Sequence, residues 1–248
     1  MLRNKFWEYH STLKMKRENG VVLEMPNGTY ILGGLTSPST SEFLPKGSDV
    51  WETGPIFPAK MRKRVMKSVH DMVRDIRLLE RSFNNGLHIN VNGGHRISKE
   101  EFIIIRVRDI LKFNINSKEW SYWYKLKEGR IKGNSMVYDG KLFVTGGCDL
   151  NTDRILSSTE IMDLSTGKSW MAGELNIARY GFGMELCTFE GKLRILVFGG
   201  VSDKFGNPCD LNSVEMWNDT SNSWHESSTK LQLQKSNFGC LSVPFKFY

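Results

Sequence analysis

A repeat of about 50 residues is the feature of this sequence that most constrains its fold. The Gly-Gly pairs at 146–147 and 199–200 lie 53 residues apart, and Trp170 and Trp224 lie 54 residues apart. Trp120 precedes Trp170 by 50 residues. Three of the tryptophans are followed by an arginine after nine or ten residues, in the pairs Trp7 and Arg17, Trp120 and Arg130, and Trp170 and Arg179. Because three independent markers keep one period, the chain is predicted to be an array of similar structural units.

Each unit has the pattern of four short antiparallel strands. A turn such as Asp139-Gly140 precedes the apolar run Leu142–Thr145, which suits a strand buried on both faces. The Gly-Gly pair ends that strand, a polar loop of variable length follows, and the fourth strand carries the tryptophan. One such sheet cannot bury both of its faces alone, so we expect the sheets to stack radially. The sequence therefore predicts an all-β protein.

The order strand, Gly-Gly, loop, Ser-x-Glu, turn, Trp and Arg resembles the kelch repeat of kelch-like β-propellers. The resemblance covers most of residues 1–58 and 86–248. It is strongest in the third and fourth units, where Ser158-Thr159-Glu160 and Ser213-Val214-Glu215 follow the Gly-Gly pairs. It implies a kelch-type β-propeller with about four full four-stranded blades. No BTB or BACK domain is expected, because the repeat begins within the first ten residues.

Two units depart from the pattern. The first keeps Gly33-Gly34, but its third strand reads Ser41-Glu42-Phe43-Leu44. In the second, the strands expected at Glu101–Ile105 and Asp109–Asn114 are separated only by Arg106-Val107-Arg108, without a diglycine. The pair Gly93-Gly94 falls earlier, where we expect the first hairpin turn. The second unit is therefore predicted to have a shortened loop.

The ends of the chain suggest an additional, composite blade. Residues 5–10 have the pattern of a fourth strand without its first three, and residues 238–244 that of a first strand alone. Two interpretations remain: four repeats plus a weak blade built from both termini, or part of a six-bladed ring. In either case residues 1–248 are expected to form a single propeller domain.

An insertion of about 19 residues distinguishes the second unit, since Trp51 and Trp120 are 69 residues apart. Within residues 59–84, apolar side chains recur every three or four positions and basic side chains occupy the other positions, which predicts a basic amphipathic helix. Such a helix can bind calmodulin, a membrane surface or nucleic acid. It can equally pack its apolar face on the propeller and leave its charges in water.

No catalytic or metal site is predicted. The five histidines have no metal-ligand spacing, and no nucleophile or phosphate-binding motif is present. Glu160 and Glu215 recur at equivalent repeat positions, which indicates a structural hydrogen-bonding role and not an acid–base pair. No cofactor is expected. The cysteines are scattered without a CxxC pair, which favours a reducing compartment: Cys148, Cys187, Cys209 and Cys240.

The candidate binding residues lie on loops at one end of the predicted blades. By resemblance to kelch-like adaptors, which hold acidic peptides with loop arginines, the candidates are Arg17, Arg130, Asn134, Arg179 and Tyr180. A guanidinium group can hold a carboxylate with two parallel hydrogen bonds. The alternative is that each repeated arginine only braces its neighbouring blade.

These observations predict a protein-interaction module that binds an acidic peptide or an actin-associated partner. The alternative is a propeller enzyme that acts on a carbohydrate or small molecule. Much of the net charge of +7 comes from residues 60–81, so the basicity is local and nucleic acid is not expected as a partner. The sequence has no apolar run near 18 residues and no apolar segment at its start, so we expect no membrane span, no signal peptide and a cytoplasmic location.

Overall fold

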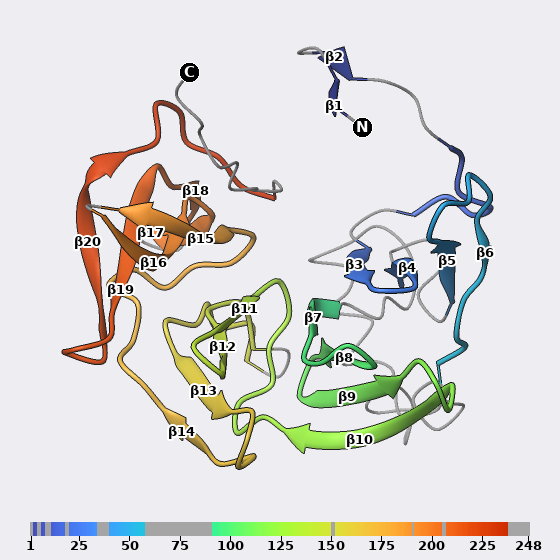
Figure 1. The fold of residues 1–248 in the computed structure, drawn as a ribbon. Coiled ribbons are helices and arrows are strands. Elements are labelled where there is room, and N and C mark those ends of the chain that lie inside the picture. Colours follow the sequence, from blue (N-terminus) through green and yellow to red (C-terminus); the bar gives the residue numbers. More distant parts are fainter. Residues whose placement is uncertain are drawn as a thin grey trace, which may run out of the picture. The chain divides into compact units, whose positions relative to one another are not determined.

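The structure is a computed structural model that describes residues 2–3, 6–7, 11–17, 20–33, 40–57, 91–149, 152–189, 191–204 and 207–237 (Figure 1). In this part of the chain the regular structure consists of strands, without a helix. The all-β prediction is therefore confirmed. The helix expected at 59–84 and the strand expected at 238–244 lie outside the described residues.

Four sheets of four strands each correspond to the four predicted repeats (Figure 1). Repeat 1 contains β3 (Val21–Met25), β4 (Gly28–Leu32), β5 (Ser41–Pro45) and β6 (Glu52–Thr53). Repeat 2 contains β7 (Val91–Arg96), β8 (Glu101–Arg106), β9 (Asp109–Asn114) and β10 (Glu119–Lys125). Repeat 3 contains β11 (Asn134–Tyr138), β12 (Lys141–Thr145), β13 (Thr159–Asp163) and β14 (Ser169–Met171). Repeat 4 contains β15 (Gly183–Phe189), β16 (Lys192–Phe198), β19 (Ser213–Asn218) and β20 (Ser223–Lys230).

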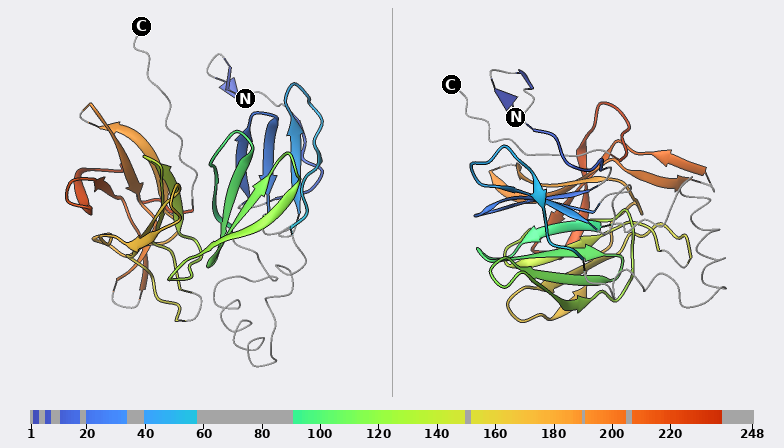
Figure 2. Two further views of the ribbon diagram at one scale, coloured as in Figure 1. Left: turned by 60° about the horizontal axis from the view of Figure 1, so that its bottom comes forward. Right: turned by 90° about the vertical axis from the view of Figure 1, so that its right-hand side faces the viewer.

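Two small hairpins complete the described strands. β17 (Val201–Lys204) and β18 (Asn207–Asp210) form a hairpin inside the loop between β16 and β19 (Figure 2). β1 (Leu2–Arg3) pairs with β2 (Phe6–Trp7). Of the N-terminal strand expected for a composite blade, only residues 6–7 are described, as β2. The composite blade stays a prediction.

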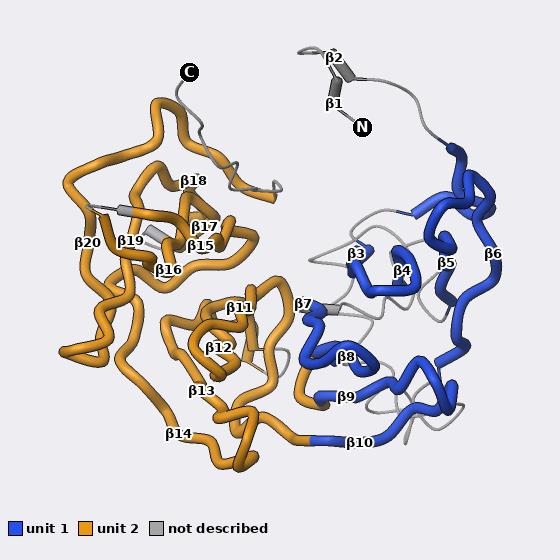
Figure 3. The backbone as a smooth tube through the Cα atoms, in the orientation of Figure 1, with its two compact units in different colours: residues 1–106, 110–123 blue, residues 107–109, 124–248 orange. Residues whose placement is uncertain are grey.

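The chain divides into two compact units (Figure 3). Unit 1 comprises residues 1–106 and 110–123, and it contains repeat 1 and most of repeat 2. Unit 2 comprises residues 107–109 and 124–248, and it contains repeats 3 and 4. The boundary crosses the chain within β10 and on either side of residues 107–109.

The core of unit 1 is formed mainly by side chains of β3, β4, β8 and β9. The first strands of repeats 1 and 2, β3 and β7, contact each other. Gly93 and Gly94 belong to β7, so the prediction that they form a hairpin turn is wrong. The turn is made by residues 97–100 instead. Gly94 is needed for the packing, because a β-carbon there would lie 2.7 Å from Cγ1 of Val21. The predicted strands of repeat 2 and its short turn between β8 and β9 are confirmed.

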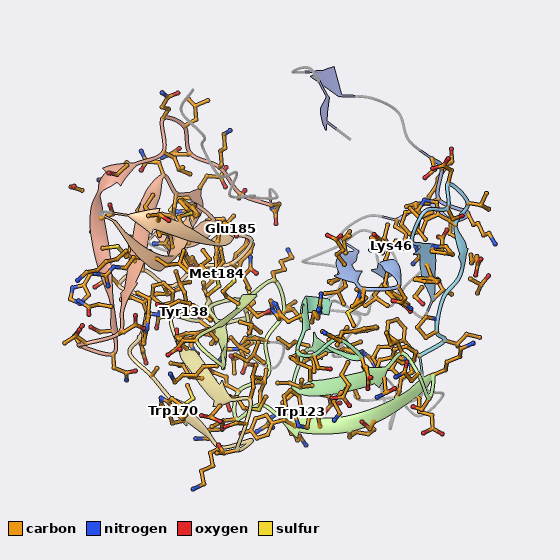
Figure 4. The ribbon with its side chains drawn as sticks, viewed as in Figure 1. Lys46, Trp123, Tyr138, Trp170, Met184 and Glu185 are labelled. Atoms are coloured by element: carbon orange, nitrogen blue, oxygen red, sulfur yellow. The ribbon has the colours of Figure 1, made fainter. Side chains whose placement is uncertain are left out.

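The core of unit 2 is rich in aromatic side chains. Phe143, Met184, Trp217 and Trp224 are buried, and Tyr138 and Trp170 pack at its edge (Figure 4 labels Tyr138, Trp170 and Met184). The Trp217 ring meets the Phe143 and Trp224 rings edge-on at centroid distances of 5.3 and 5.4 Å. The first strands of these repeats, β11 and β15, contact each other. The core thus joins repeats 3 and 4 into one body.

Candidate interaction site

A buried arginine stands at the start of repeat 4. Arg179 is 0% exposed, and its Nη1 donates to the carbonyl oxygen of Gly199 at 2.9 Å. Its Nη2 donates to Oγ of Ser213 at 3.0 Å and to Oε1 of Glu215 at 2.6 Å. Burial lowers the pKa of Arg179, and the adjacent Glu215 carboxylate opposes that shift. The guanidinium group therefore joins the end of β16 to the start of β19, the two points between which the long loop of repeat 4 leaves the sheet.

Glu215 completes this arrangement from the other side. Its carboxylate accepts the backbone N–H groups of Asn176 at 2.7 Å and Ile177 at 3.1 Å. These residues lie just before Arg179 in the chain. Glu215 is 0% exposed, so the pair with Arg179 is fully removed from water. We call such a set of arginine, glutamate, diglycine carbonyl and serine or threonine an arginine brace.

Repeat 1 has the same brace. Nε of Arg17 donates to Oε1 of Glu42 at 3.0 Å, and Nη1 donates to the carbonyl oxygen of Gly33 at 2.6 Å. Nη2 donates to Oγ1 of Thr40 at 3.0 Å. Glu42 in turn accepts the backbone N–H of Lys14 at 2.6 Å. The side chain of Arg17 is 2% exposed and that of Glu42 is 3% exposed.

Repeat 3 has a variant of the brace. Arg130, 0% exposed, donates to the carbonyl oxygen of Gly146 at 2.9 Å and to Oγ of Ser158 at 3.1 Å. Its ion pair is with Glu128, at 3.5 Å, while Glu160 accepts the backbone N–H of Lys127 at 2.8 Å. The structural role predicted for Glu160 and Glu215 is therefore confirmed.

Glycine is required at the diglycine pairs, because another segment of backbone passes close to them at each brace. Gly146 and Gly199 both have a φ of 58°, in the left-handed region. A β-carbon on Gly199 would lie 2.5 Å from the carbonyl oxygen of Lys235, and one on Gly146 would lie 2.7 Å from that of Arg179. The Lys235 carbonyl group thus faces the diglycine of repeat 4 as the Arg179 carbonyl group faces that of repeat 3. The sequence interpretation missed Lys235, because it sought only arginine at this position.

The loop end of unit 2 is the end at which β12 and β16 finish and β11 and β15 begin. Four of the predicted site residues lie there, two of them buried and two half-buried. Arg130 and Arg179 lie inside their braces, so a partner could touch their guanidinium groups only if a brace opened. Asn134 and Tyr180 are half-buried. Nδ2 of Asn134 donates to the carbonyl oxygen of Phe182 at 3.2 Å, and the Tyr180 backbone pairs with Val201. Arg17 belongs to unit 1, in the brace of repeat 1.

One further residue of the loop end was not predicted. Nζ of Lys132 lies 5.0 Å from the centroid of the Tyr180 ring. Burial lowers the pKa of Lys132 and raises that of Tyr180. When repeats 3 and 4 are aligned on their arginines, Lys132 falls at the position of Gly181. A lysine in place of this glycine is a signal that could have identified Lys132 from the sequence.

The described residues give no arrangement suited to nucleophilic or metal chemistry at the loop end. Burial raises the pKa of the nearby Cys148 thiol to about 11, so it is protonated and unreactive at neutral pH. No group of three or more His, Cys, Asp or Glu side chains within the described ranges could hold a metal ion. Nor is any helix among those residues long and apolar enough to cross a membrane.

Comparisons with known proteins agree with the repeat seen in the structure. The family model of the kelch motif matches residues 188–230, which lie in repeat 4. No curated protein matches the sequence. The solved structure of YjhT, a kelch-type propeller, matches with a TM-score of 0.60 and 16% sequence identity over 87% of this chain. The chain spans 66% of the length of YjhT, and at this identity the likeness shows the fold alone.

The family motif, the arginine braces and the shared fold lead to one identification. The motif match covers repeat 4, and the braces extend the same pattern of residues to repeats 1 and 3. Repeat 4 carries a kelch motif, and the chain has the kelch-type β-propeller fold.

Proposed function

We propose that the chain is a protein-interaction scaffold that binds its partner through the loop end of repeats 3 and 4. The observation that carries the proposal is the contrast between fixed loop bases and varied loops. Arginine braces hold the loop bases of repeats 3 and 4, whereas the loops themselves are an irregular segment after β12 and the hairpin β17–β18. Variable loops on a rigid support are where binding residues are usually found.

The expected partner is a protein with an acidic segment, or an actin-associated protein. Lys132 supplies a cationic group at the loop end, which suits a negatively charged segment of a partner. In this proposal Arg130 and Arg179 shape the site, Arg17 does the same in repeat 1, and Asn134 and Tyr180 contribute surface. We also propose that residues 1–248 form one propeller domain and that the protein works in the cytoplasm.

Affinity capture with quantitative mass spectrometry tests the scaffold function. The intact chain is compared with a variant in which residues 203–208 are replaced by Asn-Gly, which keeps the pairs of Val201 with Asp210 and Ser202 with Cys209. A matched control carries Lys192→Ala and Leu193→Ala at the opposite end of the sheet. Partners that are lost from the hairpin variant and kept by the control support the proposal. Capture that is equal for all three proteins rejects it.

A second candidate function is an enzyme that acts on a carbohydrate or small molecule. A hollow of about 470 Å³ lies in unit 1 at the end opposite to its brace, between the β3–β4 and β5–β6 turns. Glu24, Lys46, Asp49 and Arg96 line it, and Figure 4 labels Lys46. Charged side chains of both signs around a hollow suit a small polar ligand. Turnover within a carbohydrate panel that Asp49→Asn abolishes would favour this candidate.

A further inference from the structure

Lys132 adopts a backbone conformation that is unfavourable for lysine. Its φ is 53°, in the left-handed region, where a β-carbon is crowded and glycine is preferred. The equivalent residues are Gly181, with a φ of 60°, and Asn237, with a φ of 52°. Glycine and asparagine are the residues that tolerate this conformation best. Repeat 3 therefore has a lysine at a position where its fold favours a smaller residue.

The fold holds this conformation firmly. The backbone N–H of Gly181 donates to the carbonyl oxygen of Lys132 at 2.9 Å, and the backbone N–H of Asn237 donates to that of Gly181 at 2.7 Å. The three left-handed residues thus form a chain of hydrogen bonds across the loop end. Backbone strain that surrounding structure enforces is often found at functional sites.

The side chain of Lys132 is placed as firmly as its backbone. Its ammonium group lies over the Tyr180 ring, at 5.0 Å from the centroid. Tyr180 is itself fixed, because its N–H and C=O both bond to Val201, at 3.0 and 2.8 Å. Lys132 is half-buried, so part of the residue remains accessible to solvent. A cation that is ordered before binding loses less side-chain entropy when it meets an anion.

Carboxylates near Cys148 and Tyr180, the neighbours of Lys132, restrict the anion that this site could accept. Asp153 and Asp210 lie close enough to Cys148 and Tyr180, respectively, to raise the pKa of each. Asp149 is on the same loop as Asp153 and caps the backbone N–H of Thr152. An acidic run would bring several negative charges beside these aspartates and be repelled. One isolated carboxylate would meet Lys132 without that penalty.

We propose that Lys132, held over Tyr180, is the recognition point for a single isolated carboxylate on the partner protein. The inference rests on the proposed scaffold function and makes it more specific. It assigns the charge recognition of the loop end to Lys132 and leaves the buried arginines a supporting role. It also narrows the acidic segment expected on the partner to one in which a carboxylate stands among neutral residues, in preference to a run of acidic residues.

Titration of the intact chain by NMR tests the inference with defined probes. The probes are the capped peptides Gly-Gly-Glu-Gly-Gly, its glutamine counterpart and a run of five glutamates. We expect the single-glutamate peptide to shift the amide signals of Lys132 and Gly181 saturably, and the glutamine peptide to leave them unchanged. The five-glutamate run should bind no more tightly than the single glutamate. Tenfold tighter binding of the run would overturn the proposed preference.

Lys132→Gly is the decisive variant, because glycine is the residue that repeat 4 has at this position. It should weaken binding of the single-glutamate peptide about tenfold or more, while the melting temperature stays unchanged or rises by about 2–4 °C. Lys132→Arg should keep the binding, because it keeps the charge over the ring. Lys168→Gln removes a lysine elsewhere in unit 2 and should have no effect. Unchanged peptide binding by Lys132→Gly overturns the inference.

Partner capture separates this inference from the function on which it rests. If shortening the β17–β18 hairpin abolishes capture and Lys132→Gly leaves both capture and peptide binding intact, the scaffold function stands and the role of Lys132 is rejected. If neither change alters capture, the scaffold function at this end is itself rejected.

Discussion

Repeats 2 and 4 secure equivalent points of their sheets in opposite ways. In repeat 4, Arg179 and Glu215 form a fully buried ion pair at the base of a long loop. In repeat 2, Leu111 stands at the position of Glu215, three residues before the turn-forming Asn114 as Glu215 is before Asn218. Leu111 is 1% exposed, and the strand beside it has four consecutive side chains that are 0% exposed, at residues 102–105.

The difference follows the length of the loop. Repeat 2 joins β8 to β9 by the two residues Val107 and Arg108, and a short turn needs no additional support. Repeat 4 must hold the end of β16 and the start of β19 together while the chain makes the β17–β18 hairpin. A buried ion pair contributes little net stability, because desolvation of both charges offsets their attraction. Its effect in repeat 4 is to fix the loop base in one geometry.

The largest expected effect comes from breaking the pair in repeat 4. Arg179→Ala leaves Glu215 as an unpaired buried charge and removes the donors to Gly199 and Ser213. We expect the free energy of unfolding to fall by about 3–5 kcal/mol. Chemical denaturation followed by tryptophan fluorescence measures it. A loss below about 1 kcal/mol would show that the brace is dispensable and that the contrast with repeat 2 has no energetic basis.

The glycine at the loop base should be the next most sensitive position. Gly199→Ala places a β-carbon 2.5 Å from the Lys235 carbonyl oxygen and strains a φ of 58°. We expect a loss of about 2–4 kcal/mol. Gly140→Ala is the matched control, since Gly140 also has a positive φ but nothing within 4 Å of its β-carbon position, so it should lose only about 1 kcal/mol. Equal losses would contradict the proposed role of the crossing backbone.

Replacing the buried charged pair of repeat 4 with apolar side chains, as in repeat 2, tests the comparison further. The double variant Arg179→Met with Glu215→Leu should lose less stability than the sum of its single variants, by a coupling of about 1–3 kcal/mol. It should not recover fully, because the N–H groups of Asn176 and Ile177 lose their acceptor. A double-mutant cycle measures the coupling, and strict additivity would show that the two charges act independently.

The smallest effect concerns the turn before the fourth strand, where repeats 2 and 4 both use asparagine. Repeat 3 has Asp163 there, and hydrogen bonds from the Ser165 hydroxyl and the Thr166 amide lower its pKa to about 2. Because the folded pKa is depressed, the stabilisation is present above the ordinary pKa near 4 and is lost as the pH falls through about 2. Asp163→Asn should remove this pH dependence and leave stability at pH 7 nearly unchanged. Unfolding curves between pH 2 and 6 measure it, and an unaltered slope would contradict the assignment.

Much of the fold could be predicted from the sequence because its determinants are local. The glycines, tryptophans and glutamates recur with one period, and each marks a turn, a packed strand or a cap within its own sheet. The prediction for Gly93 and Gly94 was wrong for a non-local reason. A glycine pair in a turn and one in a strand look alike in sequence, and only the approach of Val21 makes Gly94 necessary.

The candidate site divides in the same way. The sequence by itself determined that Arg17, Arg130 and Arg179 recur and that a glutamate recurs with two of them in the later repeats. Only the tertiary structure decided that these arginines are buried, because their partners are carbonyl and hydroxyl groups 16 to 34 residues away along the chain. It also placed Lys132 over Tyr180, where two loops 48 residues apart meet. A guanidinium group has the same donors for a brace and for a binding site, so its role depends on whether folding covers it.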